Sequence, residues 1–256
     1  MMSSSRQVWT HIAATVLIAF AGCARVPGVP TAAADVSRPD KQLDFRVLYK
    51  QTCSGCHGDN GRGGAAIPLN NPAYLTFAGV DNLRTATAKG MSATMMPAFA
   101  ASSGGMLTEA QVDALVQGMV REWSRPSNFS GIVLPPYAAT APGNPAEGQK
   151  SYSAACARCH GADGIGIHPS ANSPAPTQDS TPHSIVDPSY LKLLSDQSLR
   201  SIVVAGHPDA SMPDWRTYIA GRALTPLEIT DIVAWLSAHR ASPAQQSAST
   251  PAKENR

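Results

Sequence analysis

Two copies of one five-residue pattern, Cys-x-x-Cys-His, constrain this 256-residue chain more than any other feature. They occupy residues 53–57 and 156–160. A tyrosine stands four residues before each pattern, a glycine-rich stretch follows it, and a Met-Pro pair comes later, at Met96 and at Met212. Because the surroundings repeat together with the pattern, the sequence predicts two copies of one domain.

Each copy closes with a segment whose apolar residues fall at helical spacing. These segments begin after Thr108 and Thr225, and Gln111 and Glu228 stand where the second partner of a capping box is expected. The chain also contains 21 prolines and 20 glycines, which favour long irregular segments and disfavour a large sheet. We therefore predict an all-α fold of two tandem domains, with short helices and long Pro/Gly-rich loops.

Changes in composition along the chain predict its division into segments. Most of the segment between the two copies is rich in proline and poor in charge, and the C-terminal tail is rich in Ser, Ala and Pro. The predicted segments are a signal peptide (1–22), a flexible tether (23–41), domain 1 (42–124), a Pro-rich linker along the surface (125–146), domain 2 (147–240) and a disordered tail (241–256).

The residue types in the repeated pattern point to a cofactor. Positions i, i+3 and i+4 of a helix share one face, so Cys53, Cys56 and His57 face the same object. Haem fits this donor set, because its vinyl groups form thioethers with two cysteines and the histidine lies beneath the iron. A redox dithiol and half of a zinc site are the alternatives. Cys156, Cys159 and His160 repeat the arrangement, which predicts two covalently attached haem c groups with iron.

With these motifs, the sequence resembles the class I c-type cytochromes, specifically a fused dihaem cytochrome c. The resemblance covers both copies and implies helices wrapped around each haem. It also implies that a methionine before the C-terminal helix is the second axial ligand of each iron, a place held here by Met96 and Met212. His57 and His160 would be the first axial ligands. Met95, Met91 and His207 compete for the second position.

Three further expectations concern packing and spare histidines. Tyr49 and Tyr152 should pack against the C-terminal helix of their own domain. Gly148 matches the small residue that the family uses where two helices cross, whereas Phe45 takes that place in the first copy, so the crossing there should differ. His168 and His183 are expected in a solvated loop, and His239 is expected at the surface.

The predicted function follows from an iron closed on both sides. The net charge of +2 is too small for an electrostatic nucleic-acid binder. An iron with two protein ligands exchanges electrons without binding substrate, so the expected partners are a redox donor and a redox acceptor protein, with no catalytic residue in the chain. The first alternative is a cytochrome subunit of a membrane dehydrogenase or reductase. The second is a dihaem enzyme of peroxidase or thiosulfate-oxidising type.

The start of the chain predicts export. A short polar stretch with one arginine precedes the apolar residues 8–20, which are fewer than the about 20 needed to cross a bilayer. Residues 20–23 then resemble a bacterial lipobox, with Phe20 where leucine is usual, and predict lipid attachment to Cys23. The protein would be anchored at the periplasmic face of a bacterial membrane. Plain export with cleavage after residues 32–34 and an uncleaved anchor are the alternatives.

Overall fold

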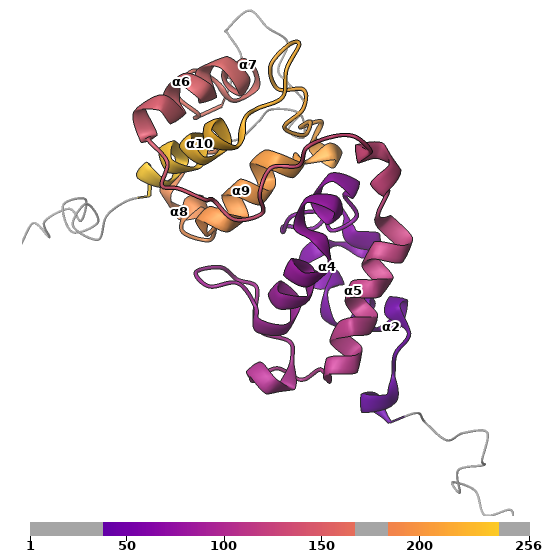
Figure 1. The fold of residues 1–256 in the computed structure, drawn as a ribbon. Helices are drawn as coiled ribbons and strands as arrows, with labels where there is room; N and C mark the ends of the chain where they lie inside the picture. The colour runs from indigo at the N-terminus through magenta and orange to yellow at the C-terminus, as the bar shows by residue number, and fades with distance from the viewer. Residues whose placement is uncertain (1–37, 167–183, 241–256) are drawn as a thin grey trace, which may run out of the picture. The chain divides into compact units, whose positions relative to one another are not determined.

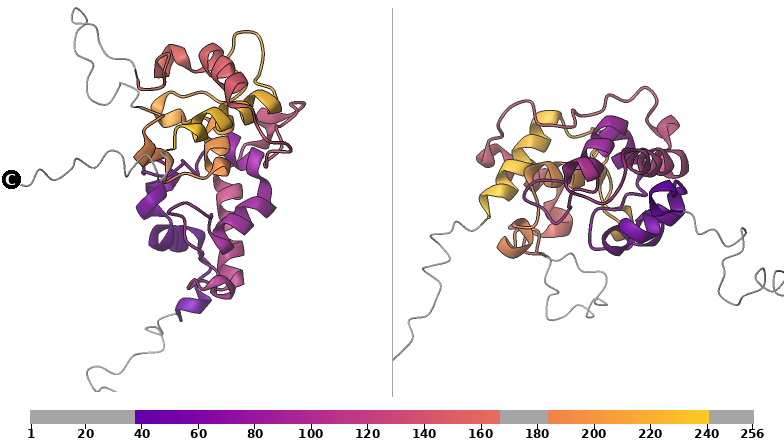
Figure 2. Two further views of the ribbon diagram at one scale, coloured as in Figure 1. Left: turned by 90° about the vertical axis from the view of Figure 1, so that its left-hand side faces the viewer. Right: turned by 90° about the horizontal axis from the view of Figure 1, so that it is seen from below.

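The described chain runs twice through a similar series of helices (Figure 1). The computed structural model describes residues 38–166 and 184–240. The α-helices are α2 (Phe45–Thr52), α3 (Ser54–His57), α4 (Pro72–Lys89), α5 (Glu109–Trp123), α6 (Pro145–Ala155), α7 (Ala157–His160), α8 (Pro188–Leu191), α9 (Asp196–Ala205) and α10 (Pro226–Ala238). The 3-10 turns are η3 (Pro39–Lys41), η4 (Asp59–Gly61), η5 (Ala101–Ser103), η6 (Pro126–Phe129) and η7 (Pro208–Ala210). In these ranges Figures 1 and 2 show helices and no strand arrows, which confirms the all-α class.

Local capping explains where the two C-terminal helices begin. The Thr108 and Thr225 side chains each accept a hydrogen bond from the backbone N–H three residues later, and the side-chain oxygen at that position accepts one from the threonine N–H. Both predicted capping boxes are therefore confirmed. The apolar faces that follow are buried, with exposures from 0% to 7%; they consist of Val112, Leu115, Val116 and Met119 in α5, and Ile229, Ile232, Val233 and Leu236 in α10.

In each domain the first and last helices cross at a glycine, but the glycine lies on the first helix in one domain and on the last helix in the other. In the second, a Cβ on Gly148 of α6 would overlap the backbone of α10 at Asp231. In the first, Phe45 fills the equivalent place on α2, and Gly118 of α5 makes room for its ring. The helices of the first domain therefore cross with a large residue on α2 against a glycine on α5, which is the difference predicted there.

In both domains the tyrosine packs against a tryptophan of the last helix, with a different ring geometry in each. Tyr49 meets Trp123 edge to face, with ring centroids 5.1 Å apart. Tyr152 stacks on Trp235 at 4.2 Å. Both tyrosines are buried, which confirms the expected packing of each against its own C-terminal helix.

The linker between the domains has mostly exposed residues, in line with the expected course along the surface, but it buries a few side chains. Phe129 is only 7% exposed. Further along, the Tyr137 ring lies 5.3 Å from that of Phe77 in α4. The buried Arg200 of α9 donates to the carbonyls of Pro136 and Tyr137. A proline-rich segment lacks many of its own N–H donors, and here its carbonyls serve as acceptors for a buried guanidinium.

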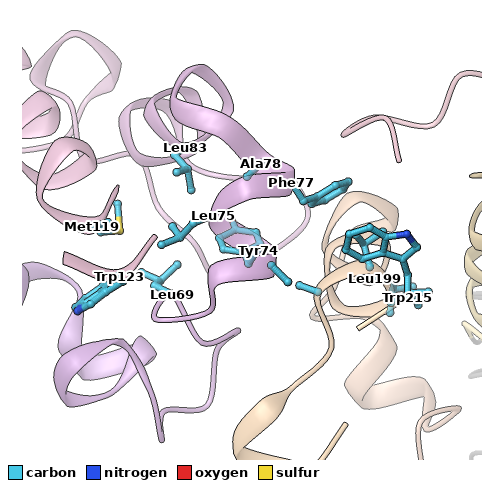
Figure 3. Packing of buried hydrophobic residues seen from close by; sticks show 14 of the residues in the cluster. Leu69, Tyr74, Leu75, Phe77, Ala78, Leu83, Met119, Trp123, Leu199 and Trp215 are labelled. Carbon is cyan, nitrogen blue, oxygen red and sulfur yellow. The ribbon is translucent and has the colours of Figure 1, made fainter. Parts of the chain in front are cut away.

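The buried residues of both domains and the linker form one cluster. Figure 3 shows Phe77 on the side of α4 nearest Leu199 and Trp215 of the second domain. Helices α4 and α9 also contact one another. Within residues 42–256 the two domains therefore share a core.

Several predicted features fall outside the described residues. They are the signal peptide 1–22 with Cys23, nearly all of the tether 23–41, the loop containing His168 and His183, and the tail 241–256. Within the described ranges, no helix combines the length and the apolar character required to cross a membrane.

The exchange of Phe45 and Gly118 predicts a coupled pair. Phe45→Ala should destabilise the holoprotein by about 3–5 kcal/mol. Gly118→Ala should also destabilise it, because the new Cβ overlaps the ring. In the Phe45→Ala background this second penalty should shrink, giving a coupling energy of about 1 kcal/mol or more in denaturant unfolding. Phe45→Ala and Gly148→Ala, in different domains, should add, and equal coupling in both pairs would contradict the assignment.

The capping box of α10 predicts a dependence of stability on acid. The Arg222 guanidinium and the Thr225 cap lower the pKa of Glu228 from 4.5 to about 2. A carboxyl with a lowered pKa contributes stability above its unfolded pKa and loses it as the pH falls through the folded value. Glu228→Gln should therefore be less stable than the parent above pH 4.5, with the difference disappearing toward pH 2. Chemical unfolding across this range measures it, with Glu147→Gln on exposed α6 as the control; a difference that persists at pH 2 would refute the prediction.

Candidate functional site

One tight turn positions each repeated motif. Cys53 ends α2 and precedes the one-turn helix α3, and its carbonyl accepts a bond from His57 N–H at 3.0 Å. The second motif repeats this between α6 and α7, where the Cys156 carbonyl accepts from His160 N–H, also at 3.0 Å. In both copies the backbone from the first cysteine to the histidine therefore makes one helical turn.

A tyrosine ties the end of each motif back to the preceding helix. The Tyr49 hydroxyl donates to the Gly58 carbonyl at 2.9 Å, and the Tyr152 hydroxyl donates to the Gly161 carbonyl at 2.6 Å. Both glycines have positive φ, 75° and 80°. The sequence analysis assigned the tyrosines to packing and missed this bond, although the equal spacing from tyrosine to glycine in both copies was a signal for it.

The imidazole of the first motif is oriented by a hydrogen bond. His57 Nδ1 lies 2.8 Å from the Ile67 carbonyl. A carbonyl only accepts, so Nδ1 carries the proton and Nε2 keeps its lone pair for a metal. Burial lowers the pKa of His57 and favours this neutral form.

The imidazole of the second motif has a lowered pKa like the first, but its hydrogen bonding differs. Burial lowers the pKa of His160 as well. Its Nδ1 is buried and has no hydrogen-bond partner among the described residues. A neutral imidazole is the form that ligates a metal.

The first cysteine of each motif lacks the lowered pKa of a redox dithiol. The four cysteines 53, 56, 156 and 159 are unpaired. Burial raises the pKa of Cys53, and burial together with the neighbouring Cys159 raises the pKa of Cys156 to about 12. A reactive dithiol requires a lowered pKa. In the described part of the chain, no three His, Cys, Asp or Glu side chains gather to hold a metal ion, so a shared zinc site finds no ligand set there.

The candidate methionines lie on similar straps that run from a glycine to the C-terminal helix. In the first domain Met91 N–H donates to the Met96 carbonyl at 3.1 Å. In the second, His207 and Met212 exchange both backbone bonds, at 2.9 and 3.1 Å. Met96 and Met212 are half-buried, whereas Met95 is 77% exposed. The exposure disfavours Met95 as a ligand.

Gly90 and Gly206 open the two straps, and both require glycine. Their φ angles are 72° and 67°. A Cβ on Gly90 would lie 2.7 Å from the Met96 carbonyl oxygen, and one on Gly206 would overlap the Pro213 carbonyl. The repeated Gly and Met-Pro spacing seen in the sequence therefore reflects a close approach of two backbone segments.

The structure also places His207, which competes for the second axial position, and His239. His207 stands opposite Met212 on the strap, and its Nδ1 is buried without a partner among the described residues. His239 ends α10, and its half-buried ring donates from Nδ1 to the Trp235 carbonyl. The surface position expected for His239 is therefore only partly right.

The residues of the second domain fit a haem group. The buried Tyr218 hydroxyl has no partner among the described residues, like the Nδ1 atoms of His160 and His207. Burial raises the pKa of Tyr218, and the nearby Cys156 raises it further, so the segment after Met212 approaches the cysteine motif. Free thiols, a neutral imidazole, a thioether on a separate strap and unpaired buried polar groups suit a covalently bound group with polar substituents.

Comparison with known proteins finds cytochrome c-type domains in both halves of the chain. A family model described as cytochrome c matches residues 145–240, and a model described as cytochrome c oxidase, cbb3-type, subunit III, matches residues 41–117. Among solved structures, the chain is similar to a chain of the reducing HAO-like protein complex of Kuenenia stuttgartiensis. The identity is 19% and the TM-score 0.44, over 80% of this chain and 99% of that chain. No curated protein matches.

Each family model therefore covers one cysteine motif and one Met-Pro strap. The model that matches residues 145–240 includes Met212, and the model that matches residues 41–117 includes Met96. The sequence repeat, the repeated local geometry and the two separate matches all divide the chain in the same way. The chain is a dihaem cytochrome c made of two fused cytochrome c domains.

Proposed function

We propose that the protein relays single electrons between a respiratory donor and an acceptor through two haems, each ligated by one histidine and one methionine. The ligand pairs are His57 with Met96 and His160 with Met212. One observation carries the proposal: each domain has its own cysteine motif and its own methionine strap, and in both domains a backbone bond to the methionine carbonyl closes the strap on itself. Each domain thus holds a complete donor set and does not share one.

The chain's own residues prepare both faces of each centre. The Ile67 carbonyl fixes the His57 tautomer, and burial keeps both imidazoles neutral. Pro97 and Pro213 stiffen the straps directly after the methionines. Haem bound there supplies a one-electron iron couple, and a methionine thioether favours the reduced state more than a second histidine does. With both axial positions filled by protein, electrons pass and substrates are excluded.

The proposal includes a membrane tether. A lipid on Cys23 would hold the protein at the periplasmic face of a bacterial membrane, with the predicted tether between the lipid and the first domain. Its support is the N-terminal sequence: a polar start, an apolar stretch too short to span a bilayer, and the lipobox-like residues 20–23. Several acyl chains on one cysteine would anchor a protein stably.

A second candidate function is a fixed cytochrome subunit of a membrane oxidoreductase complex. The observation in its favour is the family model matched by residues 41–117, which is named for a subunit of an oxidase. Both functions use the same relay chemistry and differ in whether the partner stays bound. Purification from gently solubilised membranes separates them, because a subunit migrates with its complex and a carrier migrates alone.

Replacing the axial methionines should lower the potential of one haem at a time. Met96→His and Met212→His should each keep two covalent haems per chain and shift one centre down by part of the roughly 0.8 V that axial ligands span. Redox titration with haem quantification measures both properties. Met95→His, at the exposed neighbour, is the control and should leave both potentials in place. A shift in the control with none in Met96→His would reassign the ligand, and high-spin ferric haem with peroxide turnover in the parent protein would favour an enzyme.

Removing Cys23 should release the protein from the membrane. Expressed with its full N-terminus, the parent should fractionate with membranes, and Cys23→Ser should appear in the soluble exported fraction. Both should carry two haems with unchanged spectra, because the cysteine lies apart from the motifs. Membrane association that persists in the variant would point to an uncleaved anchor or a bound partner.

A further inference from the structure

Asn71, at the start of α4 in the first domain, reaches into the second domain. Its side chain is 1% exposed. The Oδ1 atom accepts bonds from the N–H groups of Ala73 and Tyr74 and thereby caps α4. The Nδ2 atom donates to the Ala205 carbonyl at 3.1 Å, with the Gly206 carbonyl at 3.5 Å. These two carbonyls stand where α9 ends and the strap that carries Met212 begins.

The linker holds the other end of the same strap. Phe129 of η6 stacks on Trp215 with ring planes 11° apart and centroids 6.2 Å apart. The Arg216 guanidinium lies 4.5 Å from the centroid of the Phe129 ring and donates to the Asn128 carbonyl at 3.2 Å. An ion pair with Asp214 fixes that guanidinium. The strap is therefore gripped on both sides of Met212 by residues outside its own domain.

Between these two ends, the His207–Met212 backbone pair closes the strap on itself, and the strap also borders open space. A cavity of about 400 Å³ borders Met212 and Pro213 and also touches Asn71 and Phe129. A segment beside open space moves most easily, so contacts at its two ends control its position. Both straps are bonded to their own domain, through Phe99 N–H to the Thr87 carbonyl in the first and Trp215 N–H to the Val204 carbonyl in the second. The strap of the second domain has the contacts with Asn71 and Phe129 in addition.

We propose that Asn71, together with Phe129, is a positioning residue for Met212, so that the first domain sets the strength of methionine ligation at the second haem. The inference rests on the proposed ligation of that haem by Met212. Releasing the methionine requires the strap to move away, and movement at its start breaks a buried bond between Asn71 and the Ala205 carbonyl. A buried acceptor left without its donor is costly, which biases the strap toward the ligated position.

Asn71 also caps α4, and the test must separate the two roles. Asn71→Asp keeps an oxygen acceptor and is an equally good N-cap, but it loses the amide donor to Ala205. Asn71→Ser does the same without a charge. Asn70→Asp is the matched control: its Nδ2 donates to the Asn60 carbonyl at 3.0 Å, within the first domain, one residue earlier.

The experiment measures how easily imidazole displaces the methionine. All variants are made as holoprotein in a Met96→His background, where the second haem alone keeps a methionine ligand. Imidazole titration of the ferric protein follows the loss of the sulfur-to-iron charge-transfer band. Asn71→Asp and Asn71→Ser should bind imidazole about tenfold more tightly, the effect of one buried hydrogen bond. Asn70→Asp should match the background protein.

Two further variants make every outcome informative. Met212→Leu should abolish the charge-transfer band. A band that survives would overturn the proposed ligation by Met212, and with it the positioning role of Asn71. Arg216→Gln loosens the other end without touching α4 and should tighten imidazole binding several-fold. Unchanged imidazole affinity in the Asn71 variants would overturn the positioning role, even if thermal stability falls. If those variants do not fold, unchanged affinity in Arg216→Gln would overturn it.

Discussion

Each domain depends on bringing one helical turn together with a strap far along the chain. The turn needs little help, because positions i, i+3 and i+4 share a face and present two thiols and an imidazole together. The methionine belongs to another segment, and only tertiary structure delivers it. The glycines that open the straps allow that delivery, since Gly206 lies so close to the Pro213 carbonyl that no side chain fits. The helices around them hold these two segments in register.

Local features of the fold could be predicted from the sequence, and long-range ones could not. The capping boxes at Thr108 and Thr225 and the buried helix faces depend on neighbours within one or two turns. The cysteine motifs are equally local, and their repetition predicted both domains. Phe45 could be recognised as an exception, but its partner Gly118 lies on a helix at the other end of the domain. The bond from Asn71 to Ala205 has no sequence signal, because no pattern in either segment indicates that the two segments are in contact.

The repeated residues serve different purposes in the two copies. Arg84 and Arg200 occupy equivalent places after a buried leucine. Arg84 is at the surface and pairs with Glu109 and Asp113, whereas Arg200 is buried and binds the linker carbonyls at Pro136 and Tyr137. Two copies joined in tandem cannot present the same surface to each other unless they are related by a twofold axis. The contacts between them are therefore unequal, and equivalent positions are free to diverge.

This inequality bears on how an electron would pass along the chain. Two domains on an unstructured linker would act as separate carriers, with a varying distance between their centres. Here the linker contributes Phe129 to the buried cluster, its Tyr137 ring meets Phe77, and Arg200 secures its backbone. Moving the domains apart would expose these groups and leave buried polar atoms unpaired, which opposes the motion. A shared core thus supports the proposed relay through two centres over two independent carriers, and it is consistent with the proposed dependence of methionine ligation in the second domain on contacts from the first.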